Sequence, residues 1–393
     1  MMAQSGQRYV EPVFDEVNVE TGIPYSSAVR EGETSPTTLY LDFYEPAGDL
    51  LQARPLVITV FGGAFIAGSR DFVDMQTYCT RLAQHGYAAA SIDYRLLSVL
   101  HLSHTALVRE GYMAAQDVSS AVRFFKAHSE EYRIDTSNVF LLGNSAGSIA
   151  ILCELFMDES ERPAETFESP ELGSMHSSGY EEYAEFSPSV AGAIPQWGGV
   201  IDVDLISAEE YVPLCMIHGT EDTHVPYDSG YCYSSTLSGL MPYMYGSHVM
   251  ANHLDEIGIS DYEFYAFEGE EHCFYLTQYF YQLIEDKFDT CFSIVRDFLF
   301  RHLYQPQSAS EIAGNEIQVY PNPATSFVMI HMGEALMSKP RSLVVMDVMG
   351  RSVFSESKAN PRVTIDVSQW PSGVYFIRME QNGVCSVCKL VKR

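Results

Sequence analysis

Short apolar runs alternate with amphipathic segments through the first three quarters of this 393-residue chain. Runs that are nearly continuous in apolar residues lie at 56–60, 88–92, 139–142, 214–217 and 264–267. Strands of that composition belong in a sheet that is covered on both faces. The segments 115–125 and 285–300 have the apolar spacing of helices. The alternation therefore predicts an α/β fold with a mainly parallel sheet flanked by helices.

The distribution of charge divides the chain near residue 310. Residues 318–393 hold nine Lys and Arg against five Asp and Glu, whereas the preceding residues hold 14 against 47. Such an asymmetry is expected between separate domains. The stretch 305–310 is polar and helix-breaking. We therefore expect an α/β domain over 1–303, a linker over 304–317 and, because only short strands follow, a small β-sandwich over 318–393.

The net charge of −29 limits the partners that the chain can bind. A negative field of this size repels phosphate backbones and anionic lipid surfaces, so we expect neither nucleic-acid nor membrane-surface partners. No window approaches the roughly 18 consecutive apolar residues of a membrane span. The opening residues also lack the basic and apolar regions of a signal peptide. We expect a soluble chain.

Eight cysteines are too few to hold a chain of this length together as a disulfide framework. One disulfide could still form, between Cys273 and either Cys291 or Cys232. Cys385 and Cys388 have the spacing of a metal-binding pair, but no second pair accompanies them. We interpret both as ordinary strand residues and expect no metal site.

The most informative motif is Gly143-Asn144-Ser145-Ala146-Gly147. It follows the apolar run 139–142 and precedes a helical stretch at 148–156. Gly-x-Ser-x-Gly alone is common and can be a plain glycine-rich turn. Between a strand and a helix it forms a sharp elbow that exposes the serine at the carboxyl edge of the sheet. Ser145 is therefore the candidate nucleophile.

A serine hydroxyl needs a base within hydrogen-bond reach and an acid that orients the base. In enzymes built on this elbow the acid and then the histidine follow the serine, each after a late strand. Asp222 follows the run 214–217, and His272 follows the run 264–267, so we predict a Ser145–His272–Asp222 triad. The rival residues are Glu221 for the acid and His218 or His224 for the base. His218 ends a strand, which favours a hydrogen-bonded position in the core. His224 follows the acid too closely in sequence to reach across to the serine.

Backbone N–H groups must stabilise the negative oxygen of a tetrahedral intermediate. One donor is the N–H of Ala146, directly after the nucleophile. The second source is the loop 61–65, where paired glycines let backbone donors approach a substrate, although such a loop can also be a tight turn.

Four residues are candidates for substrate contact: Phe65, Asn144, Trp197 and Tyr231. The stretch 227–245 is rich in Tyr and Met and could cover a pocket for an aromatic or aliphatic ester, or simply pack as a long loop. For Trp197 a buried position in the core is favoured over a pocket wall.

These motifs together resemble the carboxylesterase branch of the α/β-hydrolases over most of residues 36–303. The segments 41–46, 92–95 and 115–118 look like their surroundings in bacterial carboxylesterases, including enzymes that act on feruloyl and acetyl esters of plant polysaccharide. Carried over by position, the resemblance implies that Gly63, Ala64 and Ala146 form the oxyanion hole. Phe61 stands where that branch usually has a histidine, and Ala64 replaces its last glycine.

The tail closely resembles the type A C-terminal sorting domain of type IX secretion over 318–393. The segments 319–324, 345–351, 371–377 and 389–393 carry this resemblance. It implies export across an outer membrane, recognition by the type IX secretion machinery, and a location outside the cell or on its surface. It also implies a cleaved signal peptide in the natural precursor.

The sequence therefore favours a secreted serine carboxylesterase that forms an acyl-enzyme on Ser145 and needs no cofactor. Its substrate is a small or polymer-attached ester, and feruloyl, acetyl-xylan and polyester substrates are alternatives with the same mechanism. A peptidase of prolyl-oligopeptidase type is another alternative, but the residues before 36 leave no room for a propeller. An inactive surface adhesin on a hydrolase fold is the third, which the complete triad disfavours.

Overall fold

The computed structural model describes residues 8–177, 179–209, 211–233, 240–277, 282–304, 317–320, 322–332, 342–347, 351–356, 362–381 and 384–393. The chain forms two compact units, one within residues 1–303 and one within residues 304–393. The linker expected at 304–317 falls almost wholly outside the described residues. Within the described ranges, no helix is long and apolar enough to cross a membrane.

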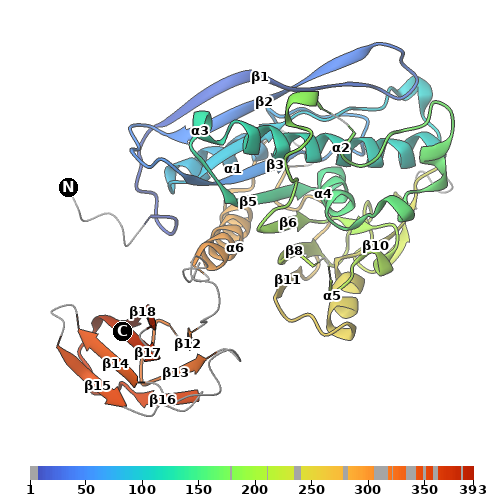
Figure 1. The fold of residues 1–393 in the computed structure, drawn as a ribbon. Coiled ribbons are helices and arrows are strands. Elements are labelled where there is room, and N and C mark those ends of the chain that lie inside the picture. Colours follow the sequence, from blue (N-terminus) through green and yellow to red (C-terminus); the bar gives the residue numbers. More distant parts are fainter. Residues whose placement is uncertain are drawn as a thin grey trace. The chain divides into compact units, whose positions relative to one another are not determined.

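An eight-stranded sheet lies at the centre of the first unit (Figure 1). Across the sheet the strands are β1 (Val17–Val29), β2 (Pro36–Pro46), β4 (Ala88–Ile92), β3 (Arg54–Val60), β5 (Ile134–Asn144), β6 (Gly192–Gln196), β8 (Leu214–Gly219) and β11 (Tyr262–Phe267). The strands from β4 to β11 are parallel. The β1–β2 hairpin continues the sheet in antiparallel fashion at the β4 edge.

Helices cover both faces of this sheet (Figure 1). They are α1 (Val73–Gln84), α2 (His104–Ala127), α3 (Ser129–Tyr132), α4 (Ala146–Phe156), α5 (Ser247–Glu256) and α6 (Glu285–Tyr304). Helices α2 and α4 pack against each other on one face. On the other face α1 contacts α6, where the rings of Tyr78 and Phe288 are 4.7 Å apart. Every residue of β3 and β4 is buried between these layers. The α/β prediction is thereby confirmed.

Shorter elements lie between the main strands and helices. A small antiparallel sheet has the order β7 (Gly199–Val200), β10 (Tyr243–Gly246) and β9 (Ser229–Tyr231). Single 3-10 turns are η1 (Val99–His101), η2 (Glu159–Glu161), η3 (Ala164–Phe167), η4 (Glu181–Tyr183) and η5 (Val203–Leu205).

The second unit consists of two antiparallel sheets, as expected for a β-sandwich. One has the order β12 (Ile317–Tyr320), β13 (Phe327–Met332) and β16 (Arg362–Asp366). The other has the order β15 (Ser352–Glu356), β14 (Ser342–Asp347), β17 (Gly373–Gln381) and β18 (Val384–Lys392). Buried residues of both sheets, among them Val328, Ile330, Val345 and Ile377, form one core. Cys385 and Cys388 both belong to β18, and Cys388 is a free thiol.

Glu110 is a buried carboxyl group in the middle of α2. Its exposed fraction is 0%, and neither carboxyl oxygen has a hydrogen-bond partner among the described residues. Burial raises the pKa of Glu110 to about 8, although nearby Arg95 acts in the opposite direction. The folded chain therefore holds a proton on Glu110 at neutral pH.

Replacing Glu110 is expected to change how stability depends on pH. Between the ordinary glutamate pKa and about 8 the folded state retains a proton that the unfolded state has lost, so the contribution of this group to stability falls as pH rises. Glu110→Gln keeps the neutral form. Between pH 5 and pH 9 we expect the difference in free energy of unfolding between this variant and wild type to shift in favour of the variant by roughly 2 kcal/mol or more. Urea unfolding at both pH values measures this. The exposed Glu130 supplies the control Glu130→Gln, and equal pH dependence in all three proteins would contradict the expectation.

Candidate active site

Ser145 lies in a sharp turn between the end of β5 and the start of α4. Its φ of 51° and ψ of −119° are rare for a residue with a side chain. Close backbone contacts explain the two flanking glycines. A Cβ atom on Gly147 would lie 2.1 Å from the carbonyl oxygen of Val60, and a Cβ on Gly143 would lie 2.7 Å from the backbone of Gly147. The turn therefore places Ser145 at the carboxyl edge of the sheet.

The structure brings Ser145, His272 and Asp222 into one hydrogen-bonded row. The Ser145 hydroxyl and Nε2 of His272 are 2.8 Å apart. Nδ1 of His272 and Oδ2 of Asp222 are 2.6 Å apart. Asp222 follows β8 and His272 follows β11, and these two strands are parallel neighbours in the sheet. With a proton on Nδ1, the imidazole donates to Asp222 and its Nε2 can accept the hydroxyl proton.

Four polar groups surround the Asp222 carboxylate. Oδ1 accepts the backbone N–H groups of His224 and Val225 at 2.8 and 3.0 Å. Oδ2 lies 2.6 Å from Nδ1 of His272 and 3.3 Å from Nε2 of His218. Burial alone would raise the pKa of Asp222, but His272 and His218 outweigh it and lower that pKa. Asp222 is therefore ionised although its side chain is fully buried.

The environment of His272 favours its protonated form. Burial alone would lower the pKa of the imidazole, but Cys273 and Asp222 beside it outweigh burial and raise that pKa. Burial also raises the pKa of the Cys273 thiol. Because a neutral thiol carries no charge at neutral pH, Asp222 is the group that stabilises the imidazolium there.

The three rival residues occupy other positions. Glu221 is exposed, whereas Asp222 points into the interior. His218 is fully buried and satisfied, with Nδ1 2.8 Å from the hydroxyl of Ser247 and Nε2 donating to the carbonyl of Val225 at 3.2 Å. Its contact with Asp222 makes His218 a support for that acid, a role that the sequence did not reveal.

His224 lies against the imidazole of His272. The two rings are stacked with centroids 4.8 Å apart and an angle of 20° between their planes. Burial, followed by the neighbouring His272, lowers the pKa of His224, which keeps its ring neutral. Asp222, His224 and His272 also place one ligand atom each within 4.8 Å of one another, close enough that the three could hold a metal ion. A metal would have to compete with the hydrogen bonds that His272 makes to Asp222 and Ser145.

The predicted oxyanion donors lie on two elements beside Ser145. Ala146 is the first residue of α4, so its N–H has no acceptor within the helix. Gly63 and Ala64 follow β3 in a tight turn, in which the carbonyl of Gly63 accepts the N–H groups of Ile66 and Ala67. Their own N–H groups have no acceptor among the residues that the structure describes. Ala64, with a φ of 53°, and Ala146 both line the cavity next to Ser145.

The buried carboxyl group of Asp74, which lies beneath the turn, was not predicted from the sequence. Asn144 donates through Nδ2 to Oδ2 of Asp74 in α1 at 2.5 Å. Burial raises the pKa of Asp74 to about 6. A Cβ on Gly62 would lie 2.7 Å from Oδ1 of Asn144. Asn144 therefore packs between the oxyanion loop and α1, and nothing near it in sequence signals the contact with Asp74.

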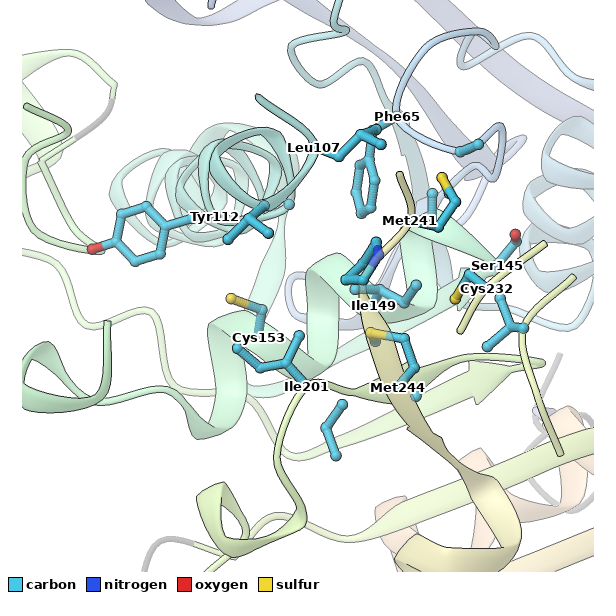
Figure 2. A pocket seen from close by; sticks show the side chains of 18 of the residues that line it. Phe65, Leu107, Tyr112, Ser145, Ile149, Cys153, Ile201, Cys232, Met241 and Met244 are labelled. Atoms are coloured by element: carbon cyan, nitrogen blue, oxygen red, sulfur yellow. The ribbon is translucent and has the colours of Figure 1, made fainter. Parts of the chain in front are cut away.

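An apolar cavity opens beside Ser145 (Figure 2). Residues of the oxyanion loop, α2, α4 and the segments 225–233 and 241–244 line it, among them Phe65, Leu107, Ile149 and Met241. None of the described lining residues carries a charge. Phe65 therefore lies where a substrate contact was expected.

The other three residues predicted to contact substrate lie outside the lining of this cavity. Asn144 points away toward Asp74 because neighbouring residues of a strand face opposite sides. Trp197 is fully buried behind His272, where it packs on Tyr275 at 4.8 Å. Tyr231 is 51% exposed on β9 and contacts Tyr243.

The possible disulfide is absent from the structure. Cys232, Cys273 and Cys291 are all free thiols. Cys232 lines the cavity, and Cys291 is buried in α6.

Comparison with known families identifies both parts of the chain. Residues 41–209 match the BD-FAE family, and residues 318–393 match the secretion system C-terminal sorting domain. The chain therefore joins an esterase-like α/β-hydrolase domain to a type IX sorting domain, and both resemblances seen in the sequence are confirmed. The sorting domain indicates export to the cell surface or beyond it.

Individual relatives are more distant. A probable isoprenylcysteine alpha-carbonyl methylesterase of Arabidopsis thaliana is 23% identical over 232 residues, which is 51% of this chain and 45% of that protein. A fumonisin B1 esterase of Sphingopyxis macrogoltabida is 30% identical over 135 residues, which is 31% of this chain and 24% of that protein. The chain thus spans less than half the length of these curated relatives.

Among solved structures, esterase 2 of Thermogutta terrifontis phosphorylated by paraoxon has the same fold. The TM-score is 0.51 at 20% sequence identity, and the alignment covers 73% of this chain and 95% of that one.

The contact between Gly147 and Val60 leads to a stability prediction. Gly147→Ala would force a Cβ against a strand carbonyl, and we expect a loss of about 3 kcal/mol in the free energy of unfolding. Gly111→Ala in α2 is the matched control, because its Cβ would meet only Phe65 at an ordinary 3.8 Å. Alanine at this helical position should be neutral or stabilising by up to about 1 kcal/mol. Calorimetric unfolding compares the variants, and equal stability would contradict the close approach of α4 to β3.

Proposed function

We propose that the first unit is a serine carboxylesterase, with Ser145 as nucleophile, His272 as general base and Asp222 as the acid that orients it. The observation that carries this proposal is the row of hydrogen bonds from Asp222 through His272 to Ser145, which ends at the mouth of an apolar cavity. Both curated relatives are named for esterase activity, which supports the same reaction class.

In the first half of the reaction, the Ser145 oxygen attacks the ester carbonyl while Nε2 of His272 takes the hydroxyl proton. The carbonyl oxygen gains the negative charge, which the N–H groups of Gly63, Ala64 and Ala146 stabilise. The tetrahedral intermediate then breaks its bond to the alcohol oxygen. His272 returns its proton to that oxygen, the alcohol leaves, and an acyl-enzyme remains on Ser145.

In the second half, water replaces the alcohol. His272 takes a proton from the water as its oxygen attacks the acyl carbon, and a second tetrahedral intermediate forms in the same oxyanion hole. When the bond to the Ser145 oxygen breaks, His272 gives the proton to that oxygen. The carboxylic acid leaves, and the enzyme returns to its starting state. Asp222 stays ionised throughout and stabilises the imidazolium that forms in each half.

The cavity argues against the peptidase alternative. A peptide would bring polar N–H and carbonyl groups into a space whose described walls are uncharged and mainly apolar. The buried and fully hydrogen-bonded Asp222 also argues against an inactive adhesin, because a binding surface has no need of an ionised group at depth.

The second unit supplies the destination in this proposal. Residues 318–393 would be recognised by the type IX secretion machinery, so that the esterase acts on esters outside the cell. No described residue of the site lies in this unit.

Ser145→Ala tests the nucleophile. We expect kcat/KM on a short nitrophenyl ester to fall by roughly 10⁴-fold or more, because no other described group holds the position next to Nε2 of His272. Paraoxon should also phosphorylate the intact protein on the peptide that contains Ser145, with release of nitrophenolate, and mass spectrometry would locate the adduct. Ser137→Ala removes an exposed hydroxyl of β5 as the control. Hydrolysis that survives Ser145→Ala would reject the mechanism.

The pH profile tests the acid and the base. His272 must be neutral to accept a proton, and its raised pKa should place the acid limb of kcat/KM above the ordinary histidine value of about 6.5. Asp222→Asn removes the negative charge, so the limb should move to lower pH and kcat should fall by about 10⁴-fold. Glu221→Gln changes the exposed neighbour, and it should leave the limb in place and kcat within about twofold of wild type. If Glu221→Gln lowers kcat and moves the limb while Asp222→Asn does neither, Glu221 and not Asp222 is the acid that orients His272.

A further inference from the structure

The cavity beside Ser145 follows one face of α4. Ile149 and Cys153 of α4 line it, together with Ser145 directly before the helix and Met157 directly after it, at a spacing of four residues. Residues at that spacing stack along one side of a helix. With a rise of about 1.5 Å per residue, Cys153 lies about 12 Å from Ser145 along the axis. Figure 2 shows Ile149 between Ser145 and Cys153.

The walls of this channel suit a saturated chain better than an aromatic acid. Leu107 from α2, Ile201 after β7 and Met244 from β10 face the residues of α4 that line the channel. Tyr112 also lines the channel, but its hydroxyl donates to the carbonyl of Gly173 at 3.2 Å. A phenolic hydroxyl bound here would lose its water without an evident replacement, at a cost of about 1–3 kcal/mol.

Met157 lines the channel just beyond the C-terminal end of α4. Its side chain is 8% exposed and accepts a contact from the thiol of Cys153 at 3.7 Å. Met157 also borders a second hollow, which is polar and contains Glu154, Asp158 and His176. The channel and this hollow therefore share Met157 as a wall.

The length available to a chain follows from these positions. C–C bonds of about 1.5 Å advance an extended chain by about 1.25 Å per carbon. The roughly 12 Å between Ser145 and Cys153 therefore accommodates about ten carbons, and at that depth the chain meets the sulfur of Met157, which lies 3.7 Å from that of Cys153.

We propose that this site is selective for esters of linear, saturated acyl chains of about eight to ten carbons, which lie along α4 and end at Met157. The proposal rests on the proposed esterase function and adds its substrate class. Cys153 and Met157 then determine the preferred chain length.

A series of nitrophenyl esters with acyl chains of 2, 4, 8, 10 and 16 carbons, together with methyl ferulate, tests the proposal. All are used below the concentrations at which they form micelles. We expect kcat/KM to peak at 8 to 10 carbons and to be at least tenfold lower for the 2-carbon ester and for methyl ferulate. Hydrolysis that depends on Ser145 but declines steadily from 2 carbons would overturn the channel and leave the esterase intact. No hydrolysis of any ester would overturn both.

Variants of the channel locate the selectivity. Cys153→Phe fills its middle, so the ratio of kcat/KM for the 8-carbon ester to that for the 2-carbon ester should fall at least tenfold. Cys153→Val should cause a smaller fall in the same ratio. Met157→Ala opens the wall to the second hollow and should shift the preferred length by about four carbons upward.

Leu155→Phe is the matched control for these variants. Leu155 lies on α4 between Cys153 and Met157 but is outside the channel lining. The same added ring there should leave the ratio unchanged within about twofold. If Cys153→Phe and Leu155→Phe lower the hydrolysis of all esters alike, the effect is structural and the proposal is wrong.

Discussion

The close approach of the first turn of α4 to β3 is the constraint on which the site depends. Because Gly147 has no side chain, the helix can begin against the carbonyl oxygen of Val60. Ser145 is then held in its unusual backbone conformation at the edge of the sheet. The same contact fixes the N–H of Ala146 beside Ser145 and sets the direction of α4, which forms one wall of the cavity. One backbone contact thus orients three parts of the site.

The acid and the base depend on the parallel pairing of β8 with β11. Gly219 is opposite Phe267 in that register, so the loops that follow them leave the sheet side by side. Burial then does not cause the Asp222 carboxylate to take up a proton, because backbone N–H groups and two imidazoles satisfy its oxygens. His218 is part of this arrangement although it never approaches Ser145 in the described contacts.

The sequence predicted those features that depend on local pattern or chain order. Strands such as β3 and β4 are buried on both faces and appear as continuous apolar runs, and the elbow is a strand-to-helix signature. The long strand β1 was missed because Gly22 and Pro24 interrupt it and most of its early residues face solvent. Proximity in sequence does not reveal which way a side chain points, and Asn144 and Trp197 both turn toward the interior. The stripe of Ile149 and Cys153 was visible as helical spacing, but its partners come from distant segments.

The division into two units separates the chemistry from the destination. The hydrolase unit contains its own core and the full hydrogen-bonded row, and the C-terminal sheets have a core of their own. The C-terminal unit therefore carries the sorting signal in a fold that is separate from the one that contains the hydrogen-bonded row. During evolution such a signal can be joined to another enzyme without rebuilding the part that carries out the reaction.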